Sequence, residues 1–416
     1  MTVALETGHS LTSLKHARIL HAGNRFRAKT ITASATATGS DGEEPNNGLT
    51  YEYWVPFDNS VPVPLDFSDA AWTATNVTVG SDGLTVTDDA TNAVHSLSDT
   101  ATTTAVEWVL GVEVERQTLA EFQLYLNDGT TTFTCFFDMR DGTVGTASNC
   151  TGQIQDLGND RFYCSIYMTV AAATSTFEFR GSNGSEATTY AGASDTIKLL
   201  RMDLNPSVAT WDFSDFSAQT GNVFCLAGHN LGSRNGRLTF AHDSNGDTTY
   251  TTIDTLSPTD DSPIMFLHDG VSSAEWRVQV DRAGGPKIAV IRIGSALTME
   301  RPFFGGFSPA HWNRTDMLSG NKSECGQFLG RDIINKGFTA RYEWKNLSDS
   351  WVRTNLDGMG GLIRAVRKEP FFIAWRANDY QDCDYVWTAA PVAGPIYSGT
   401  RDLVDFTIEA EGHGYE

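Results

Sequence analysis

The side chains in this sequence that are best suited to chemistry are aromatic rings near short polar groups. Flat rings pack against the C–H faces of sugar rings, while amides and carboxylates orient the sugar hydroxyls. The candidates for such stacking lie between positions 66 and 204: Trp72, Trp108, Tyr125, Phe162 and Tyr163. The alternative is that the rings fill a protein core, as large aromatics commonly do. That alternative is the stronger one, above all for Trp72 and Trp108.

A second polar candidate is the pair His229-Asn230, followed by Leu231 and Gly232. His229 and Asn230 could hydrogen-bond a sugar hydroxyl. Alternatively, Asn230-Leu231-Gly232 forms a tight turn whose side chains satisfy nearby backbone groups.

The segment Asp243–Asp247 places oxygen ligands at alternate positions (Asp243, Asn245 and Asp247), as a calcium loop does. A calcium loop also requires Gly at its sixth position and Glu at its twelfth, where this chain has Thr248 and Asp254. We therefore favour a hairpin turn over a calcium site, and expect no metal and no cofactor.

Catalytic motifs are missing from the sequence. It contains no GxSxG elbow, no HExxH pair and no phosphate-binding loop. Carboxylate pairs for glycoside hydrolysis are defined by their distance in space. The 51 acidic residues therefore leave that reaction open without indicating any pair. We expect a protein that is not an enzyme and has no catalytic residues.

The charge balance restricts the partners. The formal net charge is -21, and such a surface repels phosphate backbones, so nucleic acid is not expected as a ligand. No apolar stretch has transmembrane length, and the first residues do not resemble a secretion signal. Membrane insertion is therefore not expected.

The cysteines are scattered, and none has zinc-ligand spacing. The interpretation we favour is buried free thiols in a protein synthesised in a reducing cytoplasm. A Cys135–Cys150 or a Cys150–Cys164 disulfide stays open. With only 19% charged residues and abundant Thr, Ser, Gly and Ala, the composition is typical of extracellular or particle-borne β proteins.

Alternation of apolar and polar residues predicts strands at 338–345, at 404–410 and, with a continuous apolar run, at 288–293. Turn signals separate such runs at 127–129, 141–142, 158–160 and 245–247. The range 348–368 differs, because its apolar residues follow a spacing of four and three. That spacing predicts one long helix, capped by Ser348 or Asp349 and weakened by three glycines.

The composition also divides the chain, which is too long for a single core. Residues 65–200 are rich in Thr and Ala and poor in Lys, Arg and Pro, and proline-bearing segments flank them. We therefore expect an inserted domain at 62–205, a split domain made of 1–61 plus 206–300, and a C-terminal domain at 301–416.

The C-terminal range is rich in rings and in cations. Its aromatic residues (Phe303, Phe304, Trp312, Trp344, Trp351, Phe371, Phe372, Trp375 and Trp387) exceed what a small core requires. Together with arginine, such residues are enriched in permanent interfaces. We therefore predict subunit contacts at Arg331, Arg364, Arg367, Trp375 and Arg376. For the basic cluster, a solvated helix end is an equally weighted alternative.

Three ordered segments of the insert resemble the carbohydrate-binding-like jelly rolls of phage tail fibres and baseplate proteins. They are Asp66–Thr73 (DFSDAAWT), Phe136–Gly145 (FFDMRDGTVG) and Leu157–Ser165 (LGNDRFYCS). The flanking ranges resemble a discoidin-like jelly roll through YEYW at 51–54, CLAGHNLG at 225–232 and AEWRV at 274–278. That resemblance favours the turn at His229-Asn230.

The C-terminal range resembles a domain of phage tail and baseplate proteins of the distal-tail type, through GQFLGR at 326–331 and PFFIAWR at 370–376. The resemblance implies a mainly β virion protein: a split discoidin-like jelly roll, an inserted carbohydrate-binding-like jelly roll, and a C-terminal β-sandwich or α+β domain with one long helix.

We accordingly expect a structural protein of a phage tail (distal tail, baseplate or fibre-attachment ring), made in the host cytoplasm. Its expected partners are other copies of itself in a ring, neighbouring tail proteins and host cell-surface polysaccharide. The alternatives are a stand-alone lectin or polysaccharide depolymerase, and a capsid decoration protein.

Overall fold

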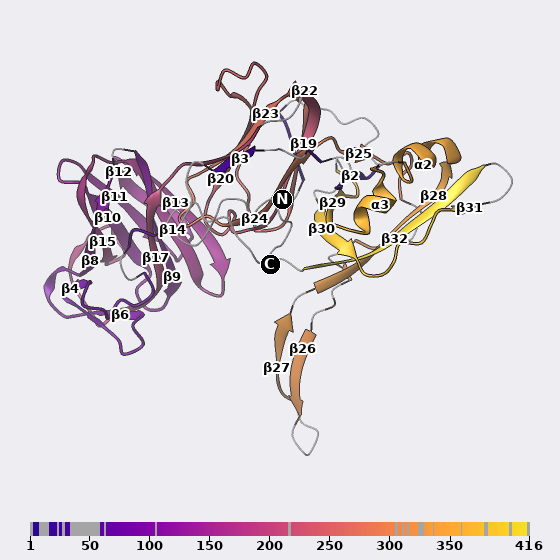
Figure 1. Ribbon diagram of the computed structural model, residues 1–416. Helices are drawn as coiled ribbons and strands as arrows, with labels where there is room; N and C mark the ends of the chain where they lie inside the picture. The colour runs from indigo at the N-terminus through magenta and orange to yellow at the C-terminus, as the bar shows by residue number, and fades with distance from the viewer. Residues whose placement is uncertain are drawn as a thin grey trace.

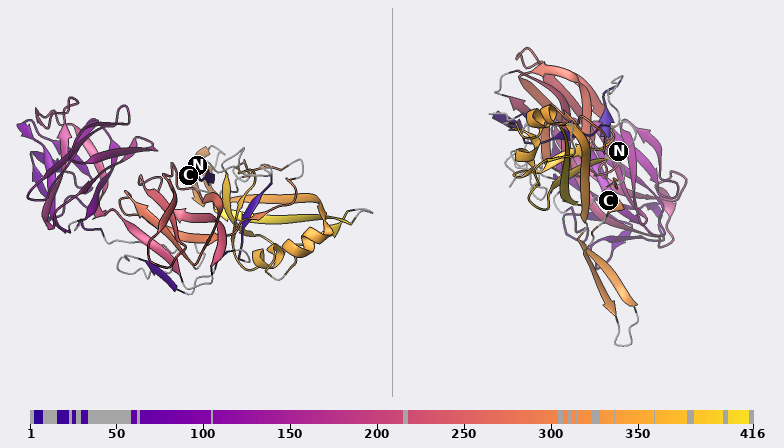
Figure 2. Two further views of the ribbon diagram at one scale, coloured as in Figure 1. Left: turned by 90° about the horizontal axis from the view of Figure 1, so that it is seen from above. Right: turned by 90° about the vertical axis from the view of Figure 1, so that its right-hand side faces the viewer.

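The computed structural model confirms a mainly β chain, with only two short helices in the part that it describes (Figures 1 and 2). The described residues are 3–7, 16–22, 25–26, 30–33, 59–61, 64–104, 106–214, 218–303, 307–309, 312–313, 315, 317–322, 328–335, 337–358, 360–377, 382–398 and 402–413. Side chains are described for all of these except 30–32, 317–322 and 328–335. Figure 1 shows three strand-built parts in a row, coloured purple, orange-pink and yellow-orange.

The first part, which we call the outer sandwich, is built from two six-stranded sheets packed face to face. The distal sheet has the order β12 (Thr143–Ser148), β11 (Thr132–Asp138), β10 (Glu121–Asn127), β15 (Ala173–Ser182), β8 (Ser96–Thr103), β4 (Thr73–Thr75). The proximal sheet has the order β13 (Thr151–Gly158), β14 (Arg161–Thr169), β9 (Glu107–Arg116), β17 (Thr196–Pro206), β6 (Thr85–Asp88), β5 (Val77–Val79). A small pair, β7 (Asn92–Val94) and β16 (Thr189–Ala191), closes one end.

Period-two alternation explains this sandwich. Along β10, Phe122, Leu124 and Leu126 are fully buried in the core between the sheets, and the residues between them face outward. The predicted turns at 127–129, 141–142 and 158–160 connect consecutive antiparallel strands. Gly129, Gly142 and Gly158 adopt positive φ there, as tight hairpins require.

The central sandwich joins segments from both sides of the outer one. One sheet, the shared sheet, has the order β1 (Val3–Leu5), β22 (Ile264–Ser273), β19 (Gln219–His229), β24 (Ile288–Gly294). The other has the order β21 (Thr251–Leu256), β20 (Arg237–Asp243), β23 (Glu275–Asp281), β18 (Ala209–Ser214), β3 (Thr30–Ala33). Trp211, Phe224 and Trp276 fill the core between these two sheets.

The chain enters and leaves the outer sandwich at neighbouring points. The Ser60 N–H donates to Leu204 O at 2.9 Å, and the Met202 N–H donates to Pro64 O at 3.1 Å. Strands β4 to β17 all lie between β3 and β18, which pair with each other. This geometry is what an inserted domain requires, and the domain division itself stays a prediction.

The third part is the C-terminal sheet. Its order is β25 (Leu297–Thr298), β2 (Arg18–Leu20), β29 (Phe371–Ala374), β30 (Cys383–Thr388), β32 (Leu403–His413), β28 (Gly337–Ser348), and β31 (Ile396–Tyr397) also pairs with β32. Strands β26 (Met317–Lys322) and β27 (Phe328–Asn335) form a separate hairpin that projects from this part (Figure 1). The strands expected at 288–293, 338–345 and 404–410 are confirmed as β24, β28 and β32.

The single long helix expected at 348–368 is wrong. The structure has α2 (Asp349–Asn355) and α3 (Leu362–Val366), with the glycine-containing stretch between them outside the helices. Glycine loses the most backbone freedom on ordering, so the break falls there. The apolar spacing was informative nevertheless, because Val352, Leu356 and Ile363 all reach the core on one face of the sheet. Ser348 is the N-terminal capping position, but its hydroxyl donates to Glu300 instead.

The shared sheet is buried on both faces. Phe224 and Ile291 face the central core, whereas Val223 and Val290 pack against Phe372 of the C-terminal sheet. Strand β2, which comes from the range 1–61 predicted to belong to the split domain, pairs with β29 in the C-terminal sheet.

The described cysteines are free thiols, namely Cys135, Cys150, Cys164, Cys225 and Cys383, in agreement with the prediction. Burial raises the pKa of Cys135 to about 12 and that of Cys150 to about 11, so neither is a reactive thiolate at neutral pH. Cys325 and the motif at 51–54 lie outside the described residues. No helix in the described ranges is long and apolar enough to cross a bilayer.

Candidate functional site

Three of the aromatic candidates lie in the core of the outer sandwich, so their prediction as sugar-stacking residues is wrong. Trp72 is 6% exposed and packs between the rings of Phe67 and Phe177. Trp108 is 4% exposed, and its indole N–H donates to the backbone. Phe162 is 6% exposed in the same core. These rings have no free face for a ligand.

Tyr163 is also buried, at the junction between the outer and central sandwiches. The guanidinium of Arg234 covers its ring, and no part of Tyr163 is exposed. A Cβ built on Gly284 would lie 1.9 Å from the Tyr163 hydroxyl, so glycine is required for this close approach. Burial raises the pKa of Tyr163 well above its usual range. The prediction of Tyr163 as a sugar ligand is therefore wrong.

Tyr125 differs from these rings because it faces outward from the distal sheet. Its neighbours across the sheet are Thr134 on β11 and Glu178 on β15, and the next row consists of Phe136, Gln123 and Arg180. We call this surface the Tyr125 face. It combines two half-buried rings with the half-buried carboxylate of Glu178 and guanidinium of Arg180, and with the amide of Gln123, which is only 7% exposed.

Ion pairing orders the centre of the Tyr125 face. Arg180 donates from Nε and Nη2 to the two carboxylate oxygens of Glu178, at 2.8 and 3.1 Å. The same guanidinium lies over the Tyr125 ring, with Cζ 3.5 Å from the ring centroid. One ring face is therefore covered by Arg180, and the cluster is preorganised as a polar and aromatic platform.

A pocket of about 180 Å³ lies at one end of the Tyr125 face. Glu121, two residues before Gln123 on β10, is buried in its wall and accepts hydrogen bonds from the Ser182 hydroxyl and the Glu186 N–H. Nη2 of Arg140 lies 3.4 Å from Oε2 of Glu121. The same guanidinium donates two hydrogen bonds, from Nε and Nη2, to the carboxylate of Asp138. The hydrogen bonds from Arg140 lower the pKa of Asp138. The pocket thus offers fixed donors and acceptors to hydroxyl groups.

The sequence contained a signal for these additional residues. Glu121, Gln123 and Tyr125 alternate with three apolar residues, which places them together on the polar side of one strand. The side-by-side position of Arg180 and Glu178 depends on strand pairing and could not be read from one strand alone.

His229 and Asn230 serve the local fold, so their prediction as sugar ligands is wrong. Nε2 of His229 lies 2.9 Å from Ser262 O, and its Nδ1 accepts the N–H of Leu231. Asn230 donates to Gly285 O and accepts from the Lys287 N–H at 2.7 Å. The turn interpretation is therefore the correct one.

The Asp243–Asp247 segment is a hairpin turn between β20 and β21. The carboxylate of Asp243 accepts the backbone N–H groups of Asn245, Gly246 and Thr248, and Asp247 accepts that of Thr249. Since backbone donors occupy these oxygens, the segment does not form a calcium loop, and that weaker candidate is wrong. The described residues contain no group of three potential metal-ligating side chains.

The predicted interface residues are divided between two surfaces. Arg364 and Arg367 are exposed at α3, and Arg367 donates to Val392 O at 2.9 Å. Trp375 and Arg376 are half-buried, with Arg376 Cζ 5.2 Å from the Trp375 ring centroid. Arg331 lies on β27, and its side chain is outside the described part.

The aromatic surplus expected in the C-terminal range is mostly absorbed by its own core. Trp344, Phe371 and Phe372 are at most 1% exposed. Among the predicted aromatic residues of this range that the structure describes, only two have an exposed side chain. They are Trp312, which is 72% exposed, and Trp387, which is 38% exposed. Most of these rings are therefore part of the C-terminal core and are not a surplus at its surface.

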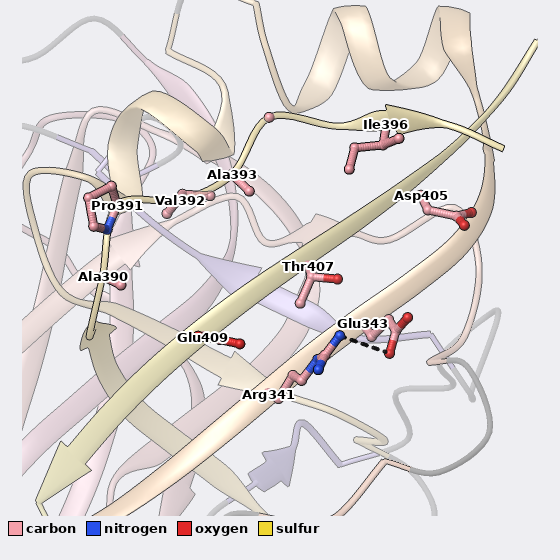
Figure 3. Close-up of a pocket in the computed structure, with 11 residues that line it drawn as sticks. Arg341, Glu343, Ala390, Pro391, Val392, Ala393, Ile396, Asp405, Thr407 and Glu409 are labelled. Atoms are coloured by element: carbon pink, nitrogen blue, oxygen red, sulfur yellow. Dashed lines mark ion pairs between the residues drawn. The ribbon is translucent and has the colours of Figure 1, made fainter.

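The C-terminal sheet also carries a groove of about 430 Å³ (Figure 3). Its floor is the outward face of β28 and β32, with Arg341, Glu343, Thr407 and Glu409. Its wall is the segment 390–394, which Arg367 anchors through Val392. Figure 3 marks the ion pair between Arg341 and Glu343, at 3.8 Å.

Comparison with known proteins yields no family. No protein-family model and no curated protein sequence matches the chain. Among solved structures, an allantoicase matches at 7% identity with a TM-score of 0.20, covering 56% of this chain and 93% of that one. The CBM32-1, CBM32-2 and M60 catalytic domains of Clostridium perfringens ZmpB match at 6% identity with a TM-score of 0.19, covering 67% of this chain and 38% of that one. Similarity at this level assigns neither an activity nor a ligand to the chain.

Proposed function

We propose that this protein is a structural, non-enzymatic component of a bacteriophage tail that contacts host-surface glycans through the Tyr125 face. One observation carries the glycan part: rings, an amide, carboxylates and guanidinium groups share the outward face of a single sheet, beside a polar pocket. Sugar recognition requires this combination of side chains.

The location of the face supports the proposal. The opposite, proximal sheet is occupied at the junction, where Glu113 and Asp203 meet Arg234 of the central sandwich. The distal sheet lies on the far side of the outer sandwich, away from the rest of the protein (Figure 1). A ligand on a large cell surface can reach such a face without colliding with the other parts.

The tail assignment rests on the resemblance of the sequence motifs to phage tail and baseplate proteins. Labelling purified phage particles of the source lysate with an antibody against the chain, followed by electron microscopy, tests it. Label on the tail is the expected result, and label on the capsid or on no particle would contradict it.

Glycan binding is tested with the full chain on an array of bacterial surface polysaccharides. Shallow sugar sites bury little apolar area, so we expect dissociation constants on the order of millimolar for one chain, and tighter binding by assemblies.

A matched control is available within the chain. Tyr250 carries Arg277 over its ring at 3.7 Å, as Tyr125 carries Arg180, but Tyr250 belongs to the central sandwich. Tyr125→Ala should abolish array binding, and Tyr250→Ala should leave it unchanged. Equal effects of the two variants would contradict the site, and release of new reducing ends from any polysaccharide would favour a depolymerase.

A further inference from the structure

The C-terminal sheet presents surfaces of opposite charge on its two faces. On β32, Asp405, Thr407 and Glu409 face the groove, while Phe406 and Ile408 face the core that α3 covers. The floor of the groove and the core under α3 are therefore on opposite faces of the strand, while Arg367 of α3 reaches the groove wall at Val392.

The groove is acidic. Three of its four charged lining residues are carboxylates: Glu343, Asp405 and Glu409, against Arg341. Glu343 is neutralised by Lys345 at 3.3 Å and by Arg341 at 3.8 Å. Glu409 is exposed and takes part in no ion pair among the described residues, so its charge is available to a partner.

The opposite face carries a basic ridge, which we define as Arg364, Arg367 and Lys368. All three are exposed, and none forms an ion pair within the described part of the chain. The nearby acidic residue Glu369 is already paired with Arg25 at 2.8 Å. The ridge therefore keeps its positive charge in a chain whose net charge is -21.

Apolar residues border the groove. Ile396, which lines the groove opposite Asp405, is 69% exposed, and Trp387, opposite Glu411 further along β32, is 38% exposed. Large exposed apolar side chains beside a groove are typical of contact surfaces. A partner with a basic surface would cover them while pairing with the groove carboxylates.

We propose that the basic ridge of one copy docks in the groove of the next copy. Within an acidic protein, this ridge supplies the complementary charge that the groove lacks, and both surfaces are on every copy. Because the ridge and the groove are two different surfaces of each copy, the contact is head-to-tail and closes into a ring if the rotation between copies permits. This inference rests on the proposed tail function, for which the sequence predicts other copies in a ring as partners, and it names the contact between those copies.

The experiment uses full-length chains in sedimentation velocity. The groove variant is Glu409→Arg, and the ridge variant combines Arg364→Glu with Lys368→Glu. Each variant alone brings like charges together at the contact. The dissociation constant of its oligomer should therefore be at least tenfold higher than that of the wild type. Asp247→Arg makes the same charge change as the groove variant on an exposed turn of the central sandwich, and should assemble like the wild type.

Mixing supplies the decisive measurement. The ridge of the groove variant fits the groove of the ridge variant, and the reversed charges fit each other. An equimolar mixture should therefore recover wild-type assembly. Wild-type oligomers that are unaffected by both variants would overturn this contact but leave the ring function in place. A wild type that stays monomeric at about 100 μM and on phage particles would overturn both.

Discussion

The guanidinium of Arg234 lies over the ring of Tyr163, with Cζ 4.6 Å from the ring centroid. Arg234 belongs to the central sandwich and Tyr163 to strand β14 of the outer one, so this contact crosses the junction between them. The same guanidinium bonds to Asp203 and Glu113, each at 3.2 Å. Asp203 is fully buried, so Arg234 supplies a cation from the central side to a buried carboxylate of the outer sandwich.

Arg234→Ala should lower the free energy of unfolding by about 2 kcal/mol, because it removes the half of these charge-assisted bonds that crosses the junction, while Asp203 keeps Arg201 and Glu113 keeps Arg161. Urea unfolding followed by tryptophan fluorescence measures the change. Arg161→Ala is the matched control, since Arg161 pairs with the same Glu113 but its side chain is 47% exposed. Arg161→Ala should lower the free energy of unfolding by less than about 1 kcal/mol. Equal losses would show that the junction geometry is unimportant.

His95 predicts a pH dependence of the outer sandwich. It is 1% exposed, and its Nδ1 lies 2.8 Å from Asn76 O while its Nε2 lies 3.1 Å from Thr91 O and 3.0 Å from Tyr190 O. Carbonyl oxygens only accept hydrogen bonds, so all of these contacts are hydrogen bonds only when both ring nitrogens donate, as they do in the protonated ring.

Burial opposes the charge on His95, but its hydrogen bonds to backbone carbonyls and the carboxylates of Asp88 and Asp89 outweigh burial and raise the pKa of His95. The folded pKa then exceeds the unfolded value of 6.5. The stabilisation is fully present below about pH 6.5 and is lost as pH rises through the folded pKa. Relative to His95→Gln, the wild type should therefore lose stability as the pH rises above 6.5. Parallel pH profiles of the two proteins would refute a charged His95.

Asp384 predicts a second pH dependence, in the C-terminal part. Burial raises the pKa of Asp384 to about 7, while the Tyr342 hydroxyl donates to its carboxylate at 3.2 Å. A raised carboxyl pKa favours the protonated folded state, so stability falls as pH rises from about 4 to about 7. Asp384→Asn keeps an acceptor for Tyr342 without the charge. It should be more stable than the wild type at pH 8, on the order of a few kcal/mol, and equal to it at pH 4. A variant destabilised at both pH values would contradict this interpretation.

Deletion of residues 66–204 should leave a soluble, folded protein. The two ends of the deleted segment run side by side, as the hydrogen bond from Ser60 to Leu204 shows, so a short connection can replace it. Circular dichroism and gel filtration would report the outcome. An unfolded or aggregated product would show that the outer sandwich is not an inserted domain.

Much of the fold could be predicted from the sequence where one strand carries its own pattern. The alternation in β28 and β32 and the glycine-containing turns gave correct elements because side-chain direction and turn geometry are local properties. Pairing between distant segments is not local. The position of β2 beside β29 could therefore not be foreseen.

The candidate site was predicted less well, and for a physical reason. An aromatic residue looks the same in a sequence whether it fills a core or faces solvent. Trp72, just before β4, and Trp108, on β9, point into the core, whereas Tyr125 on β10 points outward, and only the three-dimensional packing reveals this difference. The arginines that organise both Tyr125 and Tyr163 come from other strands or loops.

The pairing of the first strands with late parts of the chain has a consequence for synthesis. Strand β1 pairs with β22, and β2 pairs with β29, whose residues are made hundreds of positions later. On the ribosome the N-terminal segment must therefore wait, without its partners, until nearly the whole chain has emerged. All strands of the outer sandwich lie between β3 and β18, so it can fold while the rest is still being translated. The growing chain then carries a finished outer sandwich and an open framework around it, which closes only when β29 arrives.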